Sequence, residues 1–441
     1  MENVSPDLEV APKKTSVRRN MAWYLGGNMI YSASQFALVV ILSRLAGPAV
    51  LGLYVAARAL TQPPLSFASL NLRQFLAATR STEFKFAEFL GLRIVALVAA
   101  MVFIIVAAGL KRDVEYLMIV ILVALTGVFD MLSDVIYGIF QQNEQLNKIS
   151  ISRSMSGLLQ ISMFATAFYF SHSLLTSCSV LFLMAAAVTF GYDVPNLRTL
   201  YFAQKDNKLE GSATEIVLTP TYNAERLKKL FAMALPLALV WVFVSLHVNI
   251  PRYVVDSKLG KDELGFFGSM TTLMQAAALV WSALGHSTTP RLAKLFESNR
   301  AGFRSLSKKI AMLAAGSAVL NVAGGLLLGH FLLNLFFGPK YAAYSDVLTW
   351  LLAGHGMGYL VAAGRDSVTA SQRWKLQPYT NGIGVIIILV VCNLLVPKIG
   401  MMGAAYAYLI GNSVMALIYF LELYFVAWRT PDLPTADPTP A

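Results

Sequence analysis

The stretch Phe89–Leu110, FLGLRIVALVAAMVFIIVAAGL, decides the fold class, because its 22 residues carry a single charge, at Arg93. A helix of this length covers the roughly 30 Å hydrocarbon core of a bilayer. Similar runs recur along the chain, which is 56% hydrophobic and only 13% charged, whereas soluble domains carry about 25% charged residues. Continuous apolar runs, without the alternation of barrel strands, predict a polytopic α-helical membrane protein.

Twelve apolar segments are expected to span the membrane, and they fall into two halves of six. The expected spans are Met21–Leu45, Leu53–Ala77, Phe89–Leu110, Tyr116–Phe140, Ile149–Phe170, Leu174–Val194, Leu230–Ile250, Leu264–Thr289, Ile310–Phe337, Val347–Ala363, Tyr379–Val396 and Met402–Ala427. The widest polar interval separates spans six and seven. It predicts an N-terminal lobe (20–202), a cytoplasmic linker (203–229) and a C-terminal lobe (230–428), with tails at 1–19 and 429–441.

The net charge of +11 does not arise from one basic patch, because the Lys and Arg residues lie in the connections between spans. No nucleic-acid partner is therefore expected. With the N-terminus inside, nine of the 35 basic residues fall outside, namely Arg44, Arg58, Lys111, Arg112, Arg252, Lys258, Lys261, Lys340 and Lys398. The majority is then cytoplasmic, and the positive-inside rule predicts a cytoplasmic (inner) membrane protein with both termini in the cytoplasm.

Signals of catalysis or cofactor binding are scarce. Cys178 and Cys392 lie in apolar surroundings without metal or disulfide spacing, so we interpret them as small buried residues. The sequence contains no Gly-x-x-x-x-Gly-Lys-[Ser/Thr] loop, and no metal or cofactor is expected. The expected external connections are too short for a catalytic domain, so we expect a protein that is not an enzyme. Residues 1–20 lack an apolar signal-peptide core, so the first span is expected to be retained.

The two halves contain a sequence repeat. Gly47–Tyr54 (GPAVLGLY) and Gly260–Phe267 (GKDELGFF) both read Gly-x-x-x-Leu-Gly-x-aromatic, at an offset of 213 residues. In the span after the first motif, polar residues recur at helical spacing, at Arg58, Gln62, Ser66, Ser69 and Arg73. Their counterparts at the same offset are Thr271, Gln275, Leu279, Ser282 and His286. Six spans per half give both repeats one orientation, which predicts two pseudo-symmetric six-helix lobes around a central cavity.

The polar stripe of span two supplies the first candidates for binding in this cavity: Arg58, Gln62 and Arg73. A charge inside a span costs about 2.5–3.5 kcal/mol on insertion scales, so such residues usually face protein or water. A guanidinium binds phosphate oxygens in pairs and keeps its charge. We expect Pro63-Pro64 to break the helix and free carbonyl groups toward the cavity. The alternative is that both arginines reach lipid headgroups from opposite ends of the span.

Further candidates lie on spans one, seven and eight. Asn28 and Gln35 share a helical face in span one, the repeat selects Gln275 and His286, and Arg252 lies near the outer end of span seven. Polar residues of this kind also join neighbouring helices by hydrogen bonds, which is the alternative for those of span one. Arg252 either guides an anionic substrate or marks the membrane interface.

Asp130 and Asp134 are the candidates for ion coupling. They lie one helical turn apart in the inner half of span four. Two carboxylates in a span are costly unless paired or protonated, which suits them to carry a proton or bind a coupling cation. The alternative is an ion pair with an arginine of a neighbouring span, for which Arg73 is a candidate.

Five motifs along the chain resemble those of one family. They are Leu45–Tyr54, Ala234–Leu237 (ALPL), Gly260–Phe267, Phe336–Tyr341 (FFGPKY) and Pro397–Ala407 (PKIGMMGAAYA). In this order, over about 20–428, the chain resembles the polysaccharide-transporter, or O-antigen (Wzx-type) flippase, branch of the multidrug/oligosaccharidyl-lipid/polysaccharide (MOP) exporter superfamily. One position departs from the family pattern: many relatives place Asp before Arg-Tyr at the end of span seven, where this chain has Pro251.

The resemblance implies twelve helices in two lobes around a cationic cavity. It also implies ion-coupled export of undecaprenyl-diphosphate-linked oligosaccharides across a bacterial membrane, with glycan polymerase and chain-length proteins as further partners. A multidrug exporter of the same superfamily is the first alternative, but its often cationic substrates would be repelled by Arg58 and Arg73. A membrane-embedded glycan polymerase or ligase and a scaffold for glycan assembly are the others.

Overall fold

The structure, a computed structural model, describes residues 17–78, 84–111, 113–205, 216–371 and 376–427. Within these ranges, it describes the side chains of all residues except 17–22, 78, 276–280, 282–287 and 426–427. Every regular element in these ranges is helical. The helices are α1 (Val17–Ser69), α2 (Leu72–Ala78), α3 (Phe86–Gly109), α4 (Val114–Gln142), α5 (Leu146–Ser171), α6 (Leu174–Val188), the π-helix η1 (Thr189–Asp193), α7 (Val194–Lys205), α8 (Ala224–Leu259), α9 (Lys261–Ser298), α10 (Arg300–Phe336), α11 (Pro339–Ala342), α12 (Ser345–Ala370), α13 (Gln377–Ile399) and α14 (Met401–Ala427).

Nine helical stretches within the described residues are long and apolar enough to cross a membrane. One of them, Trp23–Ala77, contains the first two predicted spans, which meet at a kink at Gly47. The helices α5 and α9, with 26 and 38 residues, are also of spanning length. Each of the twelve predicted spans therefore corresponds to a helix or to one half of α1, and the predicted all-α membrane fold class is confirmed.

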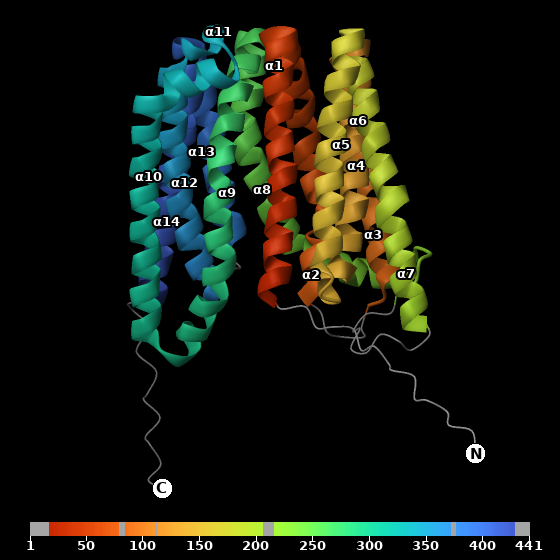
Figure 1. The fold of residues 1–441 in the computed structure, drawn as a ribbon. Coiled ribbons are helices and arrows are strands. Elements are labelled where there is room, and N and C mark those ends of the chain that lie inside the picture. The colour runs from red at the N-terminus through yellow and green to blue at the C-terminus, as the bar shows by residue number, and fades with distance from the viewer. Residues whose placement is uncertain (1–16, 79–83, 112, 206–215, 372–375, 428–441) are drawn as a thin grey trace, which may run out of the picture.

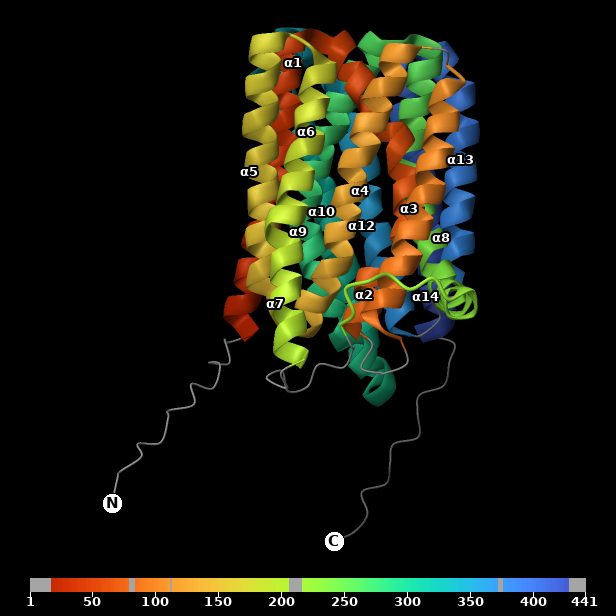
Figure 2. The ribbon, with the colours of Figure 1, turned by 90° about the vertical axis from the view of Figure 1, so that its right-hand side faces the viewer.

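The helices form two bundles that lie side by side in Figure 1, and Figure 2 shows the first bundle in front of the second. In the first bundle, α1 packs against α3 and α5, and α4 packs against α3 and α6. In the second, α12 packs against α10 and α14, while α13 packs against α14 and α8. Between the bundles, α1 contacts both α8 and α9. This is the predicted arrangement of two lobes, with α1 on one side of their junction.

Gly47 and Gly260 end the first span of each lobe in the same backbone conformation. Gly47 has φ 81° and ψ 179°, and Gly260 has φ 95° and ψ −175°. A positive φ combined with an extended ψ is open essentially to glycine alone. The first glycine of each sequence motif is therefore required by its turn, and the sequence repeat is a structural repeat at this point.

Just beyond these turns, α1 and α9 approach closely at the second glycine of each motif. A Cβ atom added at Gly52 would overlap the carbonyl oxygen of Lys261, and one added at Gly265 would overlap that of Pro48. The two contacts exchange under the 213-residue offset, so each motif touches the other in the same way. Such a reciprocal contact is the signature of a two-fold axis, here relating the two halves of one chain.

Span two differs from its prediction in one respect. Pro63-Pro64 does not break the helix, because α1 continues through both prolines. The helix breaks instead at Leu70–Asn71, where φ is 45° and 49°. Prolines are tolerated inside membrane helices where neighbouring groups satisfy the freed carbonyls. Arg73 consequently lies on the separate helix α2 and does not continue the helical stripe that begins at Arg58.

Candidate functional site

A cavity of about 440 Å³ lies between the two lobes. Its wall comes from α1 in the first lobe and from α8 and α9 in the second, and its lining residues are Met29, Tyr31, Ser32, Ala33, Gln35, Phe36, Val39, Tyr54, Val55, Arg58, Gln62, Arg252, Thr272 and Gln275. Five residues selected from the sequence are brought together here: Gln35, Arg58, Gln62, Arg252 and Gln275. A group bound in this cavity would touch both lobes, as alternating access requires.

Arg58 is half-buried on α1 and is oriented by a chain of side-chain amides. Its Nη1 donates a hydrogen bond to Oε1 of Gln35 at 3.2 Å, and Nε2 of Gln35 donates to Oε1 of Gln160 at 3.1 Å. The guanidinium carbon lies 6.0 Å from the ring centroid of Tyr54. In the part of the chain that the structure describes, no carboxylate forms an ion pair with Arg58. Its positive charge therefore remains available to an anion in the cavity.

Arg252 supplies a second guanidinium, from α8 of the other lobe. It is 7% exposed, and its terminal nitrogens donate to Oδ1 of Asn249 at 3.1 Å and to Oγ1 of Thr271 at 2.9 Å. Both acceptors are neutral, so they orient the group without neutralising it. Thr271 is the repeat counterpart of Arg58. Each lobe thus contributes one arginine to the cavity wall, from different helices of the repeat.

A second pocket, of about 210 Å³, extends from the cavity into the first lobe. We call it the side pocket, and it is lined by Tyr31, Gln35, Tyr54, Arg58, Thr61, Gln62, Leu65, Ser66, Val123, Thr126, Gly127, Asp130, Met131, Arg153, Gln160 and Leu181. Asp130 accepts a hydrogen bond through Oδ2 from the hydroxyl of Tyr31 at 3.2 Å. This candidate coupling residue therefore faces a space that shares five lining residues with the cavity, namely Tyr31, Gln35, Tyr54, Arg58 and Gln62.

Sequence reasoning missed several polar side chains of the side pocket, among them Tyr31, Arg153 and Gln160. A usable signal existed, because Arg153 and Gln160 are polar residues inside the predicted fifth span. That span carries several polar residues, and the sequence alone does not show which of them face a pocket. The structure selects this face, since a Cβ at Gly157 would lie 2.8 Å from Oγ of Ser34, which brings α5 close against α1.

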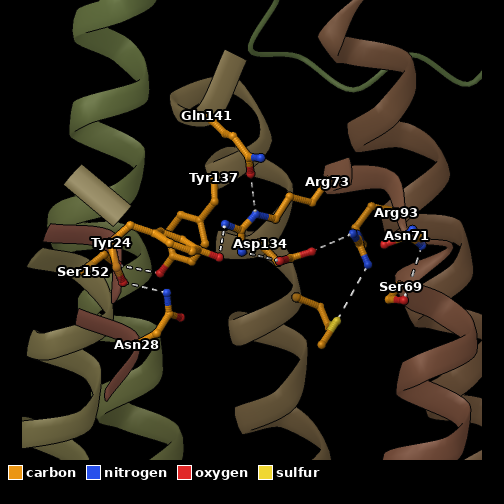
Figure 3. A network of polar contacts seen from close by, with 11 residues as sticks. Tyr24, Asn28, Ser69, Asn71, Arg73, Arg93, Asp134, Tyr137, Gln141 and Ser152 are labelled. Atoms are coloured by element: carbon orange, nitrogen blue, oxygen red, sulfur yellow. Dashed lines mark hydrogen bonds and ion pairs between the residues drawn. The ribbon is translucent and has the colours of Figure 1, made fainter. Parts of the chain in front are cut away.

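Asp134, unlike Asp130, lies between two arginines (Figure 3). Its Oδ1 is 3.5 Å from Nη1 of Arg73, and its Oδ2 is 3.3 Å from Nη2 of Arg93. Arg93 is fully buried and also donates to the carbonyl of Ala68 at 3.1 Å. The ion pair with Arg73 is the structural alternative considered for this carboxylate. Neither Arg73 nor Asp134 is among the residues that line the cavity or the side pocket.

Two further candidates are not placed in the cavity wall. Asn28 donates through Nδ2 to the carbonyl of Tyr24 at 2.8 Å, a bond within its own helix (Figure 3), and it is not among the lining residues. The side chain of His286 lies outside the described residues. The repeat counterpart of Gln62, Gln275, is exposed and lines the cavity.

Side-chain contacts join the lobes at the end of the bundle where Gly47 and Gly260 lie. Lys111 of the first lobe donates to Oδ2 of Asp256 in the second at 2.8 Å, and Lys261 also pairs with Asp256. Arg44 reaches across to the last turn of α10, where its Nε donates to the carbonyl of Phe336 at 2.9 Å. Toward the opposite end, α9 leans away from α1 (Figure 1). At that end α8 still contacts the first lobe, because Arg226 pairs with Glu88 of α3 and the ring centroids of Phe231 and Phe67 lie 6.5 Å apart. The lobes are therefore linked at both ends, by α1 with α8 and α9 at the Gly47–Gly260 end and through α8 at the other.

No family model matches the chain. By sequence, the chain is similar to the capsular polysaccharide biosynthesis protein CapF of Staphylococcus aureus, with 25% identity over 407 residues, 91% of this chain and 98% of CapF. It is also similar to a Shigella flexneri protein named as an O-antigen transporter, with 21% identity over 281 residues, 64% of this chain and 63% of that protein. These relatives agree with the polysaccharide-transporter branch that the five motifs resemble.

Solved structures share the fold. The lipid II flippase MurJ, in an inward closed conformation, matches with a TM-score of 0.68 and 12% identity over 90% of this chain and 86% of MurJ. An inward-facing multidrug resistance MATE family transporter of the MOP superfamily matches with a TM-score of 0.65 and 14% identity, over 92% and 94% of the two chains. At these identities the likeness shows the fold alone. Together with the sequence relatives, it confirms the resemblance to MOP transporters rather than to enzymes.

Proposed function

We propose that the protein is a flippase that moves an undecaprenyl-diphosphate-linked oligosaccharide across the bacterial cytoplasmic membrane for polysaccharide or O-antigen assembly. The observation that carries the proposal is the pair Arg58 and Arg252, one from each lobe, in the wall of one cavity. A planar guanidinium can donate two hydrogen bonds at once to the oxygens of a diphosphate. Neutral partners hold both arginines in place, so their charges are directed at a ligand rather than at the protein.

Transport by alternating access would proceed from the state seen here. The headgroup enters between the lobes, both arginines bind its phosphates, and the contacts at the Gly47–Gly260 end separate while the opposite end closes. With both termini in the cytoplasm, the Gly47–Gly260 end is the external one. The proposal includes this orientation and the division into lobes at 20–202 and 230–428 with a linker at 203–229. It also includes glycan polymerase and chain-length proteins as partners.

Free energy for repeated transport in one direction would come from an ion gradient, because 100 mV supplies about 2.3 kcal/mol per charge. Asp130 and Asp134 remain the proposed coupling carboxylates, and their surroundings assign them different parts. Asp130 faces the side pocket and, among the described residues, accepts one hydrogen bond, from Tyr31. Asp134 is neutralised by Arg73 and Arg93. Asp130 is therefore the group that changes its proton or cation occupancy, and Asp134 holds the helix that carries it.

Binding by the full-length protein in lipid nanodiscs tests the proposal against a multidrug exporter, the alternative that the MATE-like fold favours. The probes are undecaprenyl diphosphate bearing a disaccharide and a lipophilic cationic dye of similar mass. We expect the anionic lipid to bind and the dye to be rejected, since Arg58 and Arg252 repel a cation. Binding of the dye with no binding of the lipid would support the multidrug exporter instead.

A further inference from the structure

Arg153 lies on the face of α5 that packs against α1. The two helices approach closely on either side of Arg153. One turn before it, a Cβ added at Gly27 of α1 would overlap Ser150, and one turn after it, a Cβ added at Gly157 would lie 3.0 Å from the Cα of Tyr31. Between these two contacts, the Arg153 guanidinium carbon lies 4.7 Å from the ring centroid of Tyr31 and 5.2 Å from that of Tyr137. Two aromatic rings therefore fix the position of this cation.

Among the residues that the structure describes, Arg153 has no hydrogen-bond acceptor and no carboxylate oxygen within the 4.0 Å of an ion pair. Its Nε is buried without a partner, which leaves its terminal nitrogens to the side pocket that the residue lines. The other arginines of this region, Arg58, Arg73, Arg93 and Arg252, all donate to protein acceptors. A guanidinium held by rings and left without acceptors indicates that its acceptor is a ligand.

A second donor in the same pocket also lacks an acceptor. Gln160 is 2% exposed, and its Nε2 is buried with no hydrogen-bond partner while its Oε1 accepts from Gln35. Hydroxyl groups of Thr61, Ser66 and Thr126 complete the polar lining. A volume of about 210 Å³ is below the 300–1,000 Å³ of pockets for drug-sized ligands, and it suits one sugar or phosphate group.

Resting on the proposed function, we infer that the side pocket is a subsite for one anionic oxygen group of the lipid-linked headgroup, bound by Arg153 and Gln160. The group is either the carboxylate of an acidic sugar or a phosphate of the carrier. Asp130 is the single carboxylate among the residues that line this pocket, against the two cations Arg58 and Arg153, so the pocket stays net positive. Because Tyr31 holds Asp130, the aspartate does not occupy the acceptor position of Arg153.

The test uses the full chain in nanodiscs and three probes: undecaprenyl diphosphate alone, the same carrier bearing glucose, and the same carrier bearing glucuronic acid. The variants are Arg153→Gln, Arg153→Lys and the matched charge control Arg198→Gln, an exposed residue of α7 in the same lobe. We expect Arg153→Gln to weaken binding of the glucuronic acid probe by about tenfold or more, because a buried charge-assisted hydrogen bond is lost. If the pocket binds the phosphate, the other two probes should lose affinity equally. Arg153→Lys should restore part of the affinity, and Arg198→Gln should bind as the parent does.

The pattern of loss identifies the source of the anion. A loss confined to the glucuronic acid probe assigns a sugar carboxylate, whereas an equal loss for all three probes assigns the phosphate. Parent-like binding of all three by Arg153→Gln would overturn the inference and leave the proposed function standing. A parent protein that binds none of the probes would overturn both.

A second measurement does not depend on how Arg153→Gln folds. A cysteine at Thr126, which lines the side pocket, is placed in a background lacking Cys178 and Cys392 and labelled with a small thiol reagent. The glucuronic acid probe, which carries both candidate anions, should slow this labelling by filling the pocket. Labelling that is unchanged at a probe concentration saturating the cavity would contradict the inference.

Discussion

At the scale of single residues, the hydrogen-bond and ion-pair partners of a charged side chain indicate its role better than its residue type does. Arg58 and Arg252 donate to neutral amide or hydroxyl oxygens, so they keep their charge for a ligand. Arg93, on the other hand, is fully buried and paired with Asp134, so its charge serves the packing of α3 on α4. Burial of a charge in the N-terminal lobe therefore does not by itself indicate a binding residue.

Replacing Asp134 should reduce stability. Asp134→Asn leaves Arg73 and Arg93 facing a neutral amide, and Arg93 is 0% exposed. Removing one partner of a buried ion pair leaves an uncompensated charge, so we expect the free energy of unfolding to fall by roughly 2–3 kcal/mol. Thermal unfolding of the purified variant in detergent measures the change. A melting curve that superposes on that of the parent would show that the ion pair is not stabilising.

Asp130→Asn should have the opposite profile. An asparagine side-chain oxygen still accepts the hydrogen bond of Tyr31, so the melting temperature should stay close to that of the parent. The variant carries no titratable group at this position, and we expect transport in vesicles to stop responding to imposed proton or sodium gradients. If its transport responds to both gradients as the parent's does, coupling lies at another residue.

The residues of the cavity could be predicted from the sequence where they were polar residues in apolar spans. The repeat supported Arg58, Gln62 and Gln275, while Gln35 and Arg252 were selected without it, and all five line the cavity. Arg153, which is also a polar residue of a predicted span, was missed. Its importance depends on the two tyrosine rings that flank it and on the acceptors it lacks, and these follow from how α5 packs on α1 rather than from any local pattern.

At the scale of helices, the contact between α1 and α9 is governed by small residues. Cβ atoms at Gly52 and Gly265 would overlap backbone carbonyl oxygens of the facing motif, and one at Gly268 would overlap the side chain of Val55. Val55 and Gly268 are themselves repeat partners, so the pseudo-two-fold axis passes close to this pair. Close backbone approach at small residues is how membrane helices gain packing energy, and here it holds the lobes together at one end.

A larger residue in this contact should favour the state in which that end is open. We expect Gly265→Val to separate α1 from α9 and to increase labelling of a cysteine placed at Val55, which is 5% exposed in the structure. The readout is the rate of reaction with an impermeant thiol reagent in a background lacking Cys178 and Cys392. Gly109→Val is the matched control, because a Cβ at Gly109 would meet nothing within 4 Å. Equal labelling in both variants would contradict a gating role for this contact.

The positions of the helices were predictable, but their breaks were not. The apolar runs located all twelve spans, because a segment that crosses the bilayer must satisfy its backbone hydrogen bonds within a helix. The prolines at 63 and 64 gave a false signal, because the helix continues through them. The actual break, at Leu70–Asn71, has positive φ at both residues. Asparagine tolerates this conformation but leucine does not favour it, so only tertiary packing explains its place.

At the scale of the whole molecule, the charge distribution predicts an orientation that cysteine labelling can check. Single cysteines at Ala49 and Ser173 lie at the Gly47–Gly260 end of the bundle, and a cysteine at exposed Ser298 lies in the last turn of α9 at the other end. With both termini in the cytoplasm, the first two should react with an impermeant reagent in intact cells and Ser298 only after permeabilisation. The reverse pattern would invert the proposed direction of transport.

A transporter with two states is physically reasonable for this molecule, because a cavity lies between two lobes that contact each other reciprocally. The arginines line this cavity, so they can bind the ligand in both states. The repeat accounts for the architecture, and the departures from it account for chemistry. Thr271 stands where exact symmetry would place a third arginine, and it orients Arg252 instead. The cavity is therefore asymmetric in its hydrogen bonding although the helices around it are pseudo-symmetric.

The most direct test is translocation of a lipid-linked oligosaccharide in proteoliposomes by the parent and by Arg58→Ala, Arg58→Lys and the control Arg198→Gln. Transfer is followed by the access of an external glycosidase to the sugar. The parent and Arg198→Gln should transfer the lipid, Arg58→Ala should lose at least about 90% of the rate because a charge-assisted bond to phosphate is removed, and Arg58→Lys should recover part of it. Parent-level transfer by Arg58→Ala, or no transfer by the parent in the presence of a gradient, would contradict the account.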